Sequence, residues 1–311
     1  MKVNIHRLLK EAKDAVPQAE WIGLRRVTNY LTGFSAIDGK FDEAAGGSDE
    51  GVMLEVLYKG TFSYAATADL SSGGIKRAAE QAFAAAQAAQ PYGIHRFDQT
   101  MRPAAQVRYA SKREKLSGIP AAETVELLCS ICDAAQVSSK IIQTAASCET
   151  GICETEMVST NGADIRQTVR FGGISLNAVA REGDIIQQRS AHGRSALTYQ
   201  GGRELFNPVT LLEKARKAGT EAVELLTAEP CPNGKRTLVL MPDQMMLQIH
   251  ESVGHALEID RILGDERNYA GGSFITPEDI GSFRYGSPLM NVAFDPTIAQ
   301  ELASYGADDI G

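Results

Sequence analysis

The stretch Met53-Leu-Glu-Val-Leu-Tyr-Lys-Gly-Thr-Phe-Ser-Tyr-Ala-Ala-Thr-Ala68 decides the fold class. Its two runs of alternating residues flank Lys59-Gly60, which is the pattern of an antiparallel hairpin with a tight turn. The alanine-rich stretch that follows opens with Ser71-Ser72 and ends at Gln90-Pro91. These boundaries predict a helix with a serine N-cap, and its polar residues indicate an outer cover for the hairpin. A hairpin with a covering helix indicates an α+β fold.

The residues before this hairpin extend the same unit. Asn4 is a candidate N-cap for a helix whose apolar residues share one face and which ends before Pro17. Residues from Trp21 to Thr32 then predict a strand. Together these elements define an N-terminal α+β domain, which we place at residues 1–105.

A second α+β unit follows a looser connecting segment, and we place this central domain at residues 116–227. One helix is predicted from Pro120 to Ala135, and another begins at Asn207-Pro208 and runs through Leu226. The strands between them are separated by three predicted turns, at Glu149-Thr150-Gly151, Asn161-Gly162 and Glu182-Gly183-Asp184. Hairpins separated by long helices indicate antiparallel sheets with covering helices, not a doubly wound sheet.

Composition excludes several classes of protein. The chain has 311 residues, of which 43% are hydrophobic and 23% charged, with a net charge of −8. We expect no direct nucleic-acid binding, because such binding depends on clustered Lys and Arg. No apolar stretch is long enough to span a membrane, and charged residues interrupt the N-terminal region where a signal peptide needs an apolar core. We therefore expect a cytoplasmic protein.

The segment His250-Glu251-Ser252-Val253-Gly254-His255 carries the chemistry. Two imidazoles flanking a carboxylate are the parts of a metal-dependent peptide hydrolase. The histidines are five residues apart, which separates their side chains by about 140° on a regular helix, against about 40° for a spacing of four. A kink or a single π-turn is needed to aim both rings at one ion, and Gly254 is where the backbone can adjust. The alternative is two ordinary histidines on an amphipathic helix.

The surroundings of this segment favour a helix. Residues Arg236 to Met241 predict a short buried strand, and Pro242-Asp243 predicts a turn into the helix. Four apolar residues then follow at helical intervals. We expect the helix to end near Gly264, because glycine is common just after a helix C-terminus. The apolar residues are Met246, Ile249, Val253 and Leu257.

The run His250 to Asp260, followed by Gly271-Gly272-Ser273-Phe274, resembles the core signature of the TldD/PmbA family, whose members were once called modulators of DNA gyrase. The resemblance covers essentially the whole chain. It implies that residues 228–311 are the start of a C-terminal metallopeptidase domain. It also implies a zinc-dependent peptidase that hydrolyses unfolded or short peptides, including leader peptides.

The H-E-x-x-x-H motif places the chain on the TldD side of that family. The resemblance implies that His250 and His255 are zinc ligands and that Glu251 is the catalytic glutamate. It also implies a heterodimer with a TldE/PmbA-like subunit; a homo-oligomer is the other assembly we consider.

The third zinc ligand that the resemblance implies is a cysteine farther along a longer chain. No cysteine follows Cys231 here, so we expect a C-terminally truncated member, either a natural short form or a fragment. Glu258, three residues after His255, is a candidate substitute ligand, and we rank Cys231 below it. The alternative function is a non-catalytic peptide-binding or assembly subunit.

The other cysteines do not indicate chemistry. Cys129 and Cys132 fall on the apolar face of a predicted helix, which favours core packing over a redox or zinc site. Cys148 and Cys153 flank a predicted turn and could approach across a hairpin. Without a secretory signal, we expect all five cysteines to be free thiols.

Overall fold

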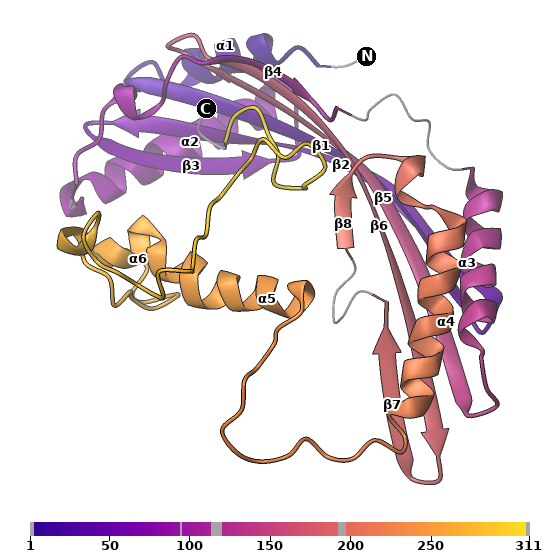
Figure 1. Cartoon of the computed structure of the whole chain (residues 1–311). Coiled ribbons are helices and arrows are strands. Elements are labelled where there is room, and N and C mark those ends of the chain that lie inside the picture. The colour runs from indigo at the N-terminus through magenta and orange to yellow at the C-terminus, as the bar shows by residue number, and fades with distance from the viewer. Residues whose placement is uncertain (1–2, 94, 113–119, 192–196, 309–311) are drawn as a thin grey trace.

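The computed structural model describes residues 3–93, 95–112, 120–191 and 197–308. One curled sheet of eight strands forms the body of the molecule, with α1 and α2 at one end and α3 and α4 at the other (Figure 1). The α+β class predicted from the sequence is confirmed. Among the described residues, the structure contains no helix that is both long and apolar enough to cross a membrane.

The helices are α1 (Ile5–Ala15), α2 (Ser72–Ala89), α3 (Ala121–Ala135), α4 (Pro208–Glu224), α5 (Pro242–Ile249) and α6 (Ile259–Leu263). The strands are β1 (Trp21–Ile37), β2 (Lys40–Tyr58), β3 (Thr61–Thr67), β4 (Gln106–Ala110), β5 (Ile141–Ser159), β6 (Asp164–Glu182), β7 (Ile185–Ser190) and β8 (Leu197–Gln200). The main path through the sheet is β3-β2-β1-β5-β6-β4, and β7 and β8 also pair with β6. Strand β4 is parallel to β6, and the other pairs are antiparallel.

Three helices begin at the N-caps that the sequence predicts. The Asn4 side chain accepts from the His6 amide at 2.9 Å, and Ser71 Oγ accepts from the Gly74 amide at 3.2 Å. The Asn207 side chain likewise accepts at the start of α4, where Pro208 is the first helical residue. Each cap satisfies an amide that has no partner inside its helix, which fixes where the helix starts.

The sequence predicts some of the turns between strands and misses others. Lys59 and Gly60 have φ values of 46° and 80°, so the β2–β3 hairpin is confirmed. The β1–β2 hairpin turns at Asp38-Gly39, with φ values of 50° and 72°, and was not predicted although Asp-Gly is a strong hairpin signal.

The predicted turn at Glu149-Thr150-Gly151 is wrong, because β5 runs straight through it. A Cβ on Gly151 would lie 2.3 Å from the ring of Phe171 on β6. The glycine therefore makes room for an aromatic side chain on the neighbouring strand and does not reverse the chain.

Two hydrophobic cores lie at the two ends of the shared sheet. One packs α1 and α2 against β1 and β2, and the other packs α3 and α4 against β5 and β6. Strand β5 contributes to both cores through Val158 and Ala146. The two cores thus share one continuous sheet, and each takes residues from both halves of the chain, since Ala36 belongs to the α3–α4 core and Val158 to the α1–α2 core.

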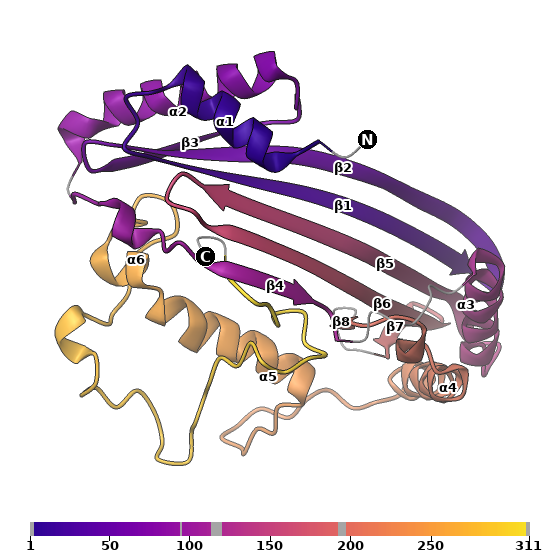
Figure 2. The same cartoon turned by 90° about the horizontal axis from the view of Figure 1, so that it is seen from above.

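Residues 228–308 are packed differently. The predicted buried strand at 236–241 is wrong, because these residues form no strand and Leu238 and Val239 are 77% and 79% exposed. The predicted apolar stripe is also largely exposed at Met246 and Leu257. Seen from above, α5 lies on the β4 side of the sheet (Figure 2). An apolar run in the sequence therefore does not mark a core here.

The chain after α6 returns to the sheet at a buried glutamine. Gln200 is fully buried, and its Nε2 donates to the carbonyl oxygens of Glu301 at 3.0 Å and Ser304 at 2.6 Å. Its Oε1 accepts from Tyr109 at 3.1 Å and from Ser111 at 2.7 Å. This amide anchors residues 301–304 to the sheet.

Replacing Gln200 with Leu should release this anchor. The substitution leaves several buried polar groups without a partner, each costing about 1–3 kcal/mol. We expect faster amide hydrogen exchange in residues 300–307, measured by mass spectrometry. Gln188→Leu on the exposed face of β7 is the matched control. Equal exchange in both variants would show that the anchor is unimportant.

The cysteines are free thiols, and the core-packing interpretation of Cys129 and Cys132 is confirmed by their place in the second core. The predicted approach of Cys148 and Cys153 across a hairpin is wrong, because both lie on β5. Burial raises the pKa of Cys148 to about 11 and also raises the pKa of Cys132.

Thiol reactivity should follow this burial. A raised pKa keeps a thiol protonated and unreactive at pH 8, whereas the exposed Cys231 is accessible. We expect a thiol-specific reagent to modify Cys231 first and Cys132 and Cys148 only after unfolding, as measured by peptide mass spectrometry. Rapid labelling of Cys148 in the folded protein would contradict this placement.

Candidate metal centre

The helix that carries the two histidines changes its hydrogen-bond register between them. Helix α5 ends at Ile249, a π-helical turn spans His250–Gly254, and a 3₁₀ turn spans His255–Leu257. The His255 amide donates to the carbonyl of His250, five residues earlier. Of the two adjustments considered from the sequence, the structure has the π-turn.

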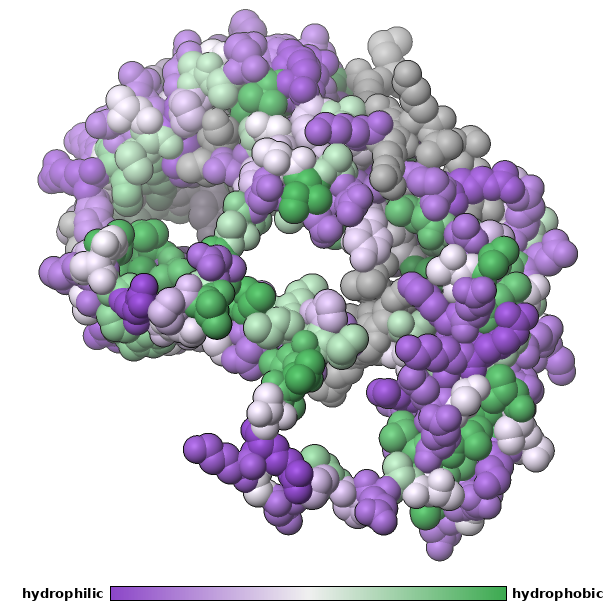
Figure 3. All heavy atoms as spheres, viewed as in Figure 1, coloured by the Kyte–Doolittle hydropathy of each residue, from purple (hydrophilic) through white to green (hydrophobic). Residues whose placement is uncertain are grey.

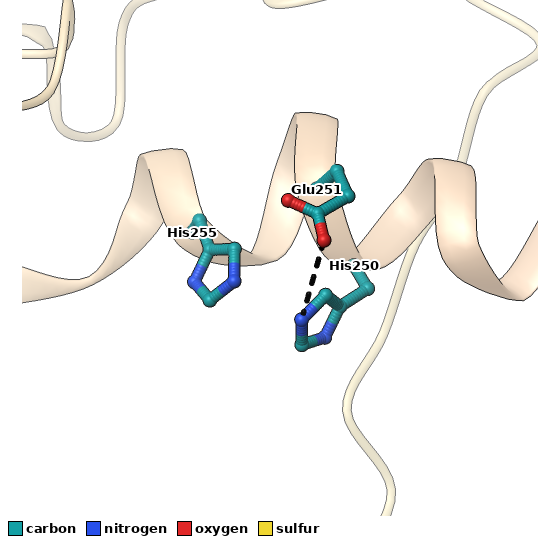
Figure 4. Close-up of side chains that lie close together, drawn as sticks. All are labelled: His250, Glu251 and His255. Carbon is teal, nitrogen blue, oxygen red and sulfur yellow. Dashed lines mark ion pairs between the residues drawn. The ribbon is translucent and has the colours of Figure 1, made fainter. Parts of the chain in front are cut away.

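This register brings the two rings together. Both histidines project from the same side of the helix (Figure 4), and their ring centroids are 4.4 Å apart. One potential ligand atom from each of His250, Glu251 and His255 lies within 4.8 Å of the others. The Glu251 carboxylate is 3.8 Å from Nε2 of His250. The chemistry of this donor set suits a zinc ion, which prefers imidazole nitrogen and carboxylate oxygen.

The two rings differ in their surroundings. The side chain of His250 is 60% exposed and that of His255 is 29% exposed. Nδ1 of His255 lies 2.9 Å from Oε1 of Glu258. A carboxylate on one ring nitrogen fixes the orientation of the ring and leaves Nε2 free for an ion. His255 is therefore the better-ordered of the two candidate ligands.

Glu258 occupies a position that regular helix geometry does not predict. Its backbone is extended, with φ −65° and ψ 124°, so the helix is interrupted there before α6 begins. Its carboxylate contacts both His255 and Arg261. The hydrogen bond to His255, followed by the charge of Arg261, holds the pKa of Glu258 below its usual range. Among the described residues, two clusters have ligand atoms close enough together to hold a metal ion. Glu258 belongs to the cluster with Asp260 and Glu266, and the two histidines belong to the cluster with Glu251.

Sequence reasoning identified the three central residues but missed the contacts behind them. Arg261 pairs with Glu258, and its Nη1 donates to the carbonyl of Ala270 at 3.2 Å. The three-residue spacing of Glu258 and Arg261 is a helical ion-pair signal that could have indicated the first contact. The contact with Ala270 depends on the loop conformation and has no local sequence signal. The predicted C-terminal boundary at Gly264 is confirmed by its φ of 85°.

Exposed apolar side chains surround the centre. They gather over α5 and around α6 in the space-filling view (Figure 3). Their members are Met245, Met246, Leu247, Leu257, Ile259 and Leu263. Exposed apolar side chains gathered beside a polar site are a feature of sites that bind other polypeptides.

An α+β sheet followed by a helix with two converging histidines and a glutamate defines a candidate metal-dependent hydrolase. Two family models match the chain: PmbA/TldA metallopeptidase domain 1 over residues 24–86 and the PmbA/TldA metallopeptidase central domain over residues 114–226. The chain belongs to the TldD/PmbA family of metallopeptidases. Both matched regions lie before the histidine segment.

Individual relatives agree with this assignment. A metalloprotease of Methanothermobacter thermautotrophicus is 28% identical over 314 residues, which is 100% of this chain and 64% of the relative. A metalloprotease of Methanocaldococcus jannaschii is 25% identical, over 88% of this chain and 58% of the relative. The chain therefore spans less than two thirds of the length of either curated relative.

The fold has counterparts among solved structures. A Bacteroides thetaiotaomicron protein described as a modulator of DNA gyrase superposes with a TM-score of 0.54 at 15% identity. The superposition covers 73% of this chain and 50% of that protein. This likeness shows that the two chains share a fold.

Proposed function

We propose that this chain carries the zinc site of a TldD-type peptidase that hydrolyses unfolded or short peptides. The observation that supports it best is the π-turn, which brings His250 and His255 together despite their spacing of five. A backbone irregularity of this kind is uncommon in helices and concentrates at functional sites. Two ordinary histidines on an amphipathic helix would not need it.

Each residue of the centre has a chemical role in this proposal. His250 and His255 would hold the ion through ring nitrogens, and Glu258 would keep the His255 ring oriented. When bound, zinc acts as a Lewis acid and lowers the pKa of a water molecule toward ~7. Glu251 would accept the proton of the attacking water as a general base. Its 60% exposure leaves it accessible to water and to substrate.

A catalytic zinc site normally has three protein ligands. Within this chain we propose Glu258 as the third, with Cys231 ranked below it. The two Glu258 oxygens contact His255 and Arg261, so the carboxylate would have to exchange one of these contacts to reach the ion. The cysteine that the family resemblance implies is the alternative, and it would come from polypeptide outside these 311 residues.

Two substitutions of Glu258 separate a ligand from an orienting partner. Glu258→Gln keeps an oxygen near Nδ1 of His255 but removes the negative charge. If Glu258 is a ligand, we expect both Glu258→Gln and Glu258→Ala to weaken zinc binding by more than the roughly 10–100-fold that loss of an orienting partner costs. If it only orients the ring, Glu258→Gln should retain most of the affinity. Competition for zinc with a chromophoric chelator measures the zinc affinity of both variants. Glu278→Gln, at an exposed glutamate, is the control.

The surroundings of the centre and the charge of the chain suit an unfolded peptide as substrate. The exposed apolar side chains around α5 and α6 would contact side chains of an unfolded peptide. The net charge of −8 favours basic peptides and gives no support to direct nucleic-acid binding. We propose a cytoplasmic protein that assembles with a TldE/PmbA-like subunit or with copies of itself.

The metal content of the purified chain tests the proposal. We expect about one zinc per chain by elemental analysis and loss of that zinc in a His250→Ala, His255→Ala double variant. His95→Ala removes an exposed histidine elsewhere and should change nothing. Absence of zinc from the unmodified chain would contradict the proposal and favour a non-catalytic peptide-binding or assembly subunit.

A further inference from the structure

Two side chains from the loop after α6 donate hydrogen bonds to backbone carbonyls on either side of His255. Ser273 donates to the carbonyl of Ala256, and Tyr285 donates to the carbonyl of Ser252. We infer that Ser273 and Tyr285 are positioning residues that hold the π-turn and thereby aim His255 toward the metal position. This inference rests on the proposed zinc site and assigns a function to the Gly271-Gly272-Ser273-Phe274 motif.

The need for such donors follows from the broken register of this helix. The segment passes from α-helix to π-turn to 3₁₀ turn and then to an extended residue at Glu258. The last carbonyls of a helix have no amide partner inside it, and Ala256 is one of them. A side-chain hydroxyl that supplies the missing hydrogen bond stabilises this termination.

Ser273 is well placed to supply one of these hydrogen bonds. Its Oγ lies 2.7 Å from the Ala256 oxygen and also accepts from the Ile275 amide at 2.9 Å. Its own amide donates to the carbonyl of Arg261 at 3.3 Å. Ile275 is only 4% exposed, which anchors the loop beside the helix. The serine hydroxyl is thus fixed by contacts on both sides.

The turn that delivers Ser273 depends on glycine. Gly271 has a φ of 85°, a conformation that favours glycine strongly over other residues. Among the described residues, apart from the immediate chain neighbours, no heavy atom lies within 4 Å of a Cβ built on Gly271 or Gly272, so crowding does not require either glycine. The backbone conformation at Gly271 is therefore the reason for glycine in this motif.

Tyr285 reaches the other carbonyl from a small aromatic cluster. Its ring stacks on Phe274 with centroids 5.7 Å apart and an angle of 20° between the planes. Phe274 also packs edge-to-face against Phe283 at 6.4 Å. These contacts orient the tyrosine ring, and its hydroxyl then meets Ser252 within the π-turn.

The consequence for the metal site is geometric. Ser252 and Ala256 lie three residues before and one residue after His255, so the two hydrogen bonds bracket the ligand. If the segment relaxed to a regular helix, the two histidines would point about 140° apart. Loss of the donors should therefore lower the fraction of molecules whose rings converge, and zinc affinity should fall with that fraction.

The test uses Ser273→Ala, Tyr285→Phe and the double variant. Tyr285→Phe removes the hydroxyl but keeps the stacked ring. We expect the double variant to bind zinc 10–100-fold more weakly in a chelator competition, as for other residues that support metal ligands. We also expect faster amide hydrogen exchange in residues 252–257 of the metal-free protein. Ser273→Thr keeps a hydroxyl at this position and, unlike Ser273→Ala, should leave zinc affinity and amide exchange close to those of the unmodified chain.

The matched controls are Ser282→Ala and Tyr269→Phe, because the Ser282 hydroxyl donates to carbonyls of its own turn and Tyr269 is 93% exposed. Unchanged exchange and unchanged zinc affinity in the double variant would overturn the inference. If the unmodified chain binds no zinc, the proposed function fails. Faster exchange in the metal-free double variant would still support the role of Ser273 and Tyr285 in holding the π-turn.

Discussion

If the chain is the proposed zinc peptidase, replacing Glu251 with Gln should leave zinc bound and lower the hydrolysis of an unfolded peptide by roughly 10²–10⁴-fold, which is the usual contribution of a general base. The amide keeps the size of the side chain but cannot accept the proton of the attacking water. The ring nitrogens of His250 and His255 are unaffected by this change. Both quantities can be measured on one preparation, by elemental analysis and by cleavage of a fluorogenic unfolded peptide.

The contrast with other variants makes this result specific. Glu278→Gln, an exposed carboxylate in the following loop, should alter neither zinc content nor hydrolysis. Loss of zinc from Glu251→Gln would assign Glu251 as a metal ligand, which its place in the three-residue cluster also allows. Hydrolysis at the unmodified rate with zinc still bound would exclude Glu251 as the general base.

The sequence pointed to the convergence of His250 and His255 because of a specific geometric conflict. Histidines five residues apart cannot share an ion on a regular helix, and Gly254 offered a place for the adjustment. The structure confirms a π-turn over His250–Gly254. Local hydrogen-bonding chemistry was equally informative at the N-caps Asn4, Ser71 and Asn207, because a cap acts within three residues of chain.

The features that sequence reasoning missed depend on contacts between distant residues. Gly151 was interpreted as a turn residue, whereas it accommodates Phe171 from the next strand. The apolar run at 236–241 was interpreted as a buried strand, although burial depends on a partner surface that the run itself does not specify. Ser273 and Tyr285 reach their carbonyls across 17 and 33 residues of chain. Local patterns contain no information about such pairings.

Among single substitutions of charged residues in the sheet, replacing Arg26 should cause the largest loss of stability. Its side chain is only 3% exposed, and it pairs with Glu156 and donates to the carbonyl of Val3 at 2.6 Å. Removing one partner of a buried ion pair costs about 3–5 kcal/mol, because the remaining charge is left poorly solvated. We expect Arg26→Met to lower the free energy of unfolding by about 3 kcal/mol, as measured by urea denaturation.

The neighbouring charges set both the size of this effect and its controls. Arg166 lies 3.4 Å from Glu156 and is 47% exposed, so it continues to neutralise part of the glutamate in the variant. Arg166→Met should itself cost no more than about 1 kcal/mol, because exposed ion pairs contribute little. A combined Arg26→Met, Glu156→Leu variant removes both charges and should recover part of the lost stability. Arg26→Met and Arg166→Met could instead lower the free energy of unfolding equally. In that case the Arg26–Glu156 pair contributes no more than an exposed ion pair, and backbone pairing and apolar packing hold strands β1 and β5 together.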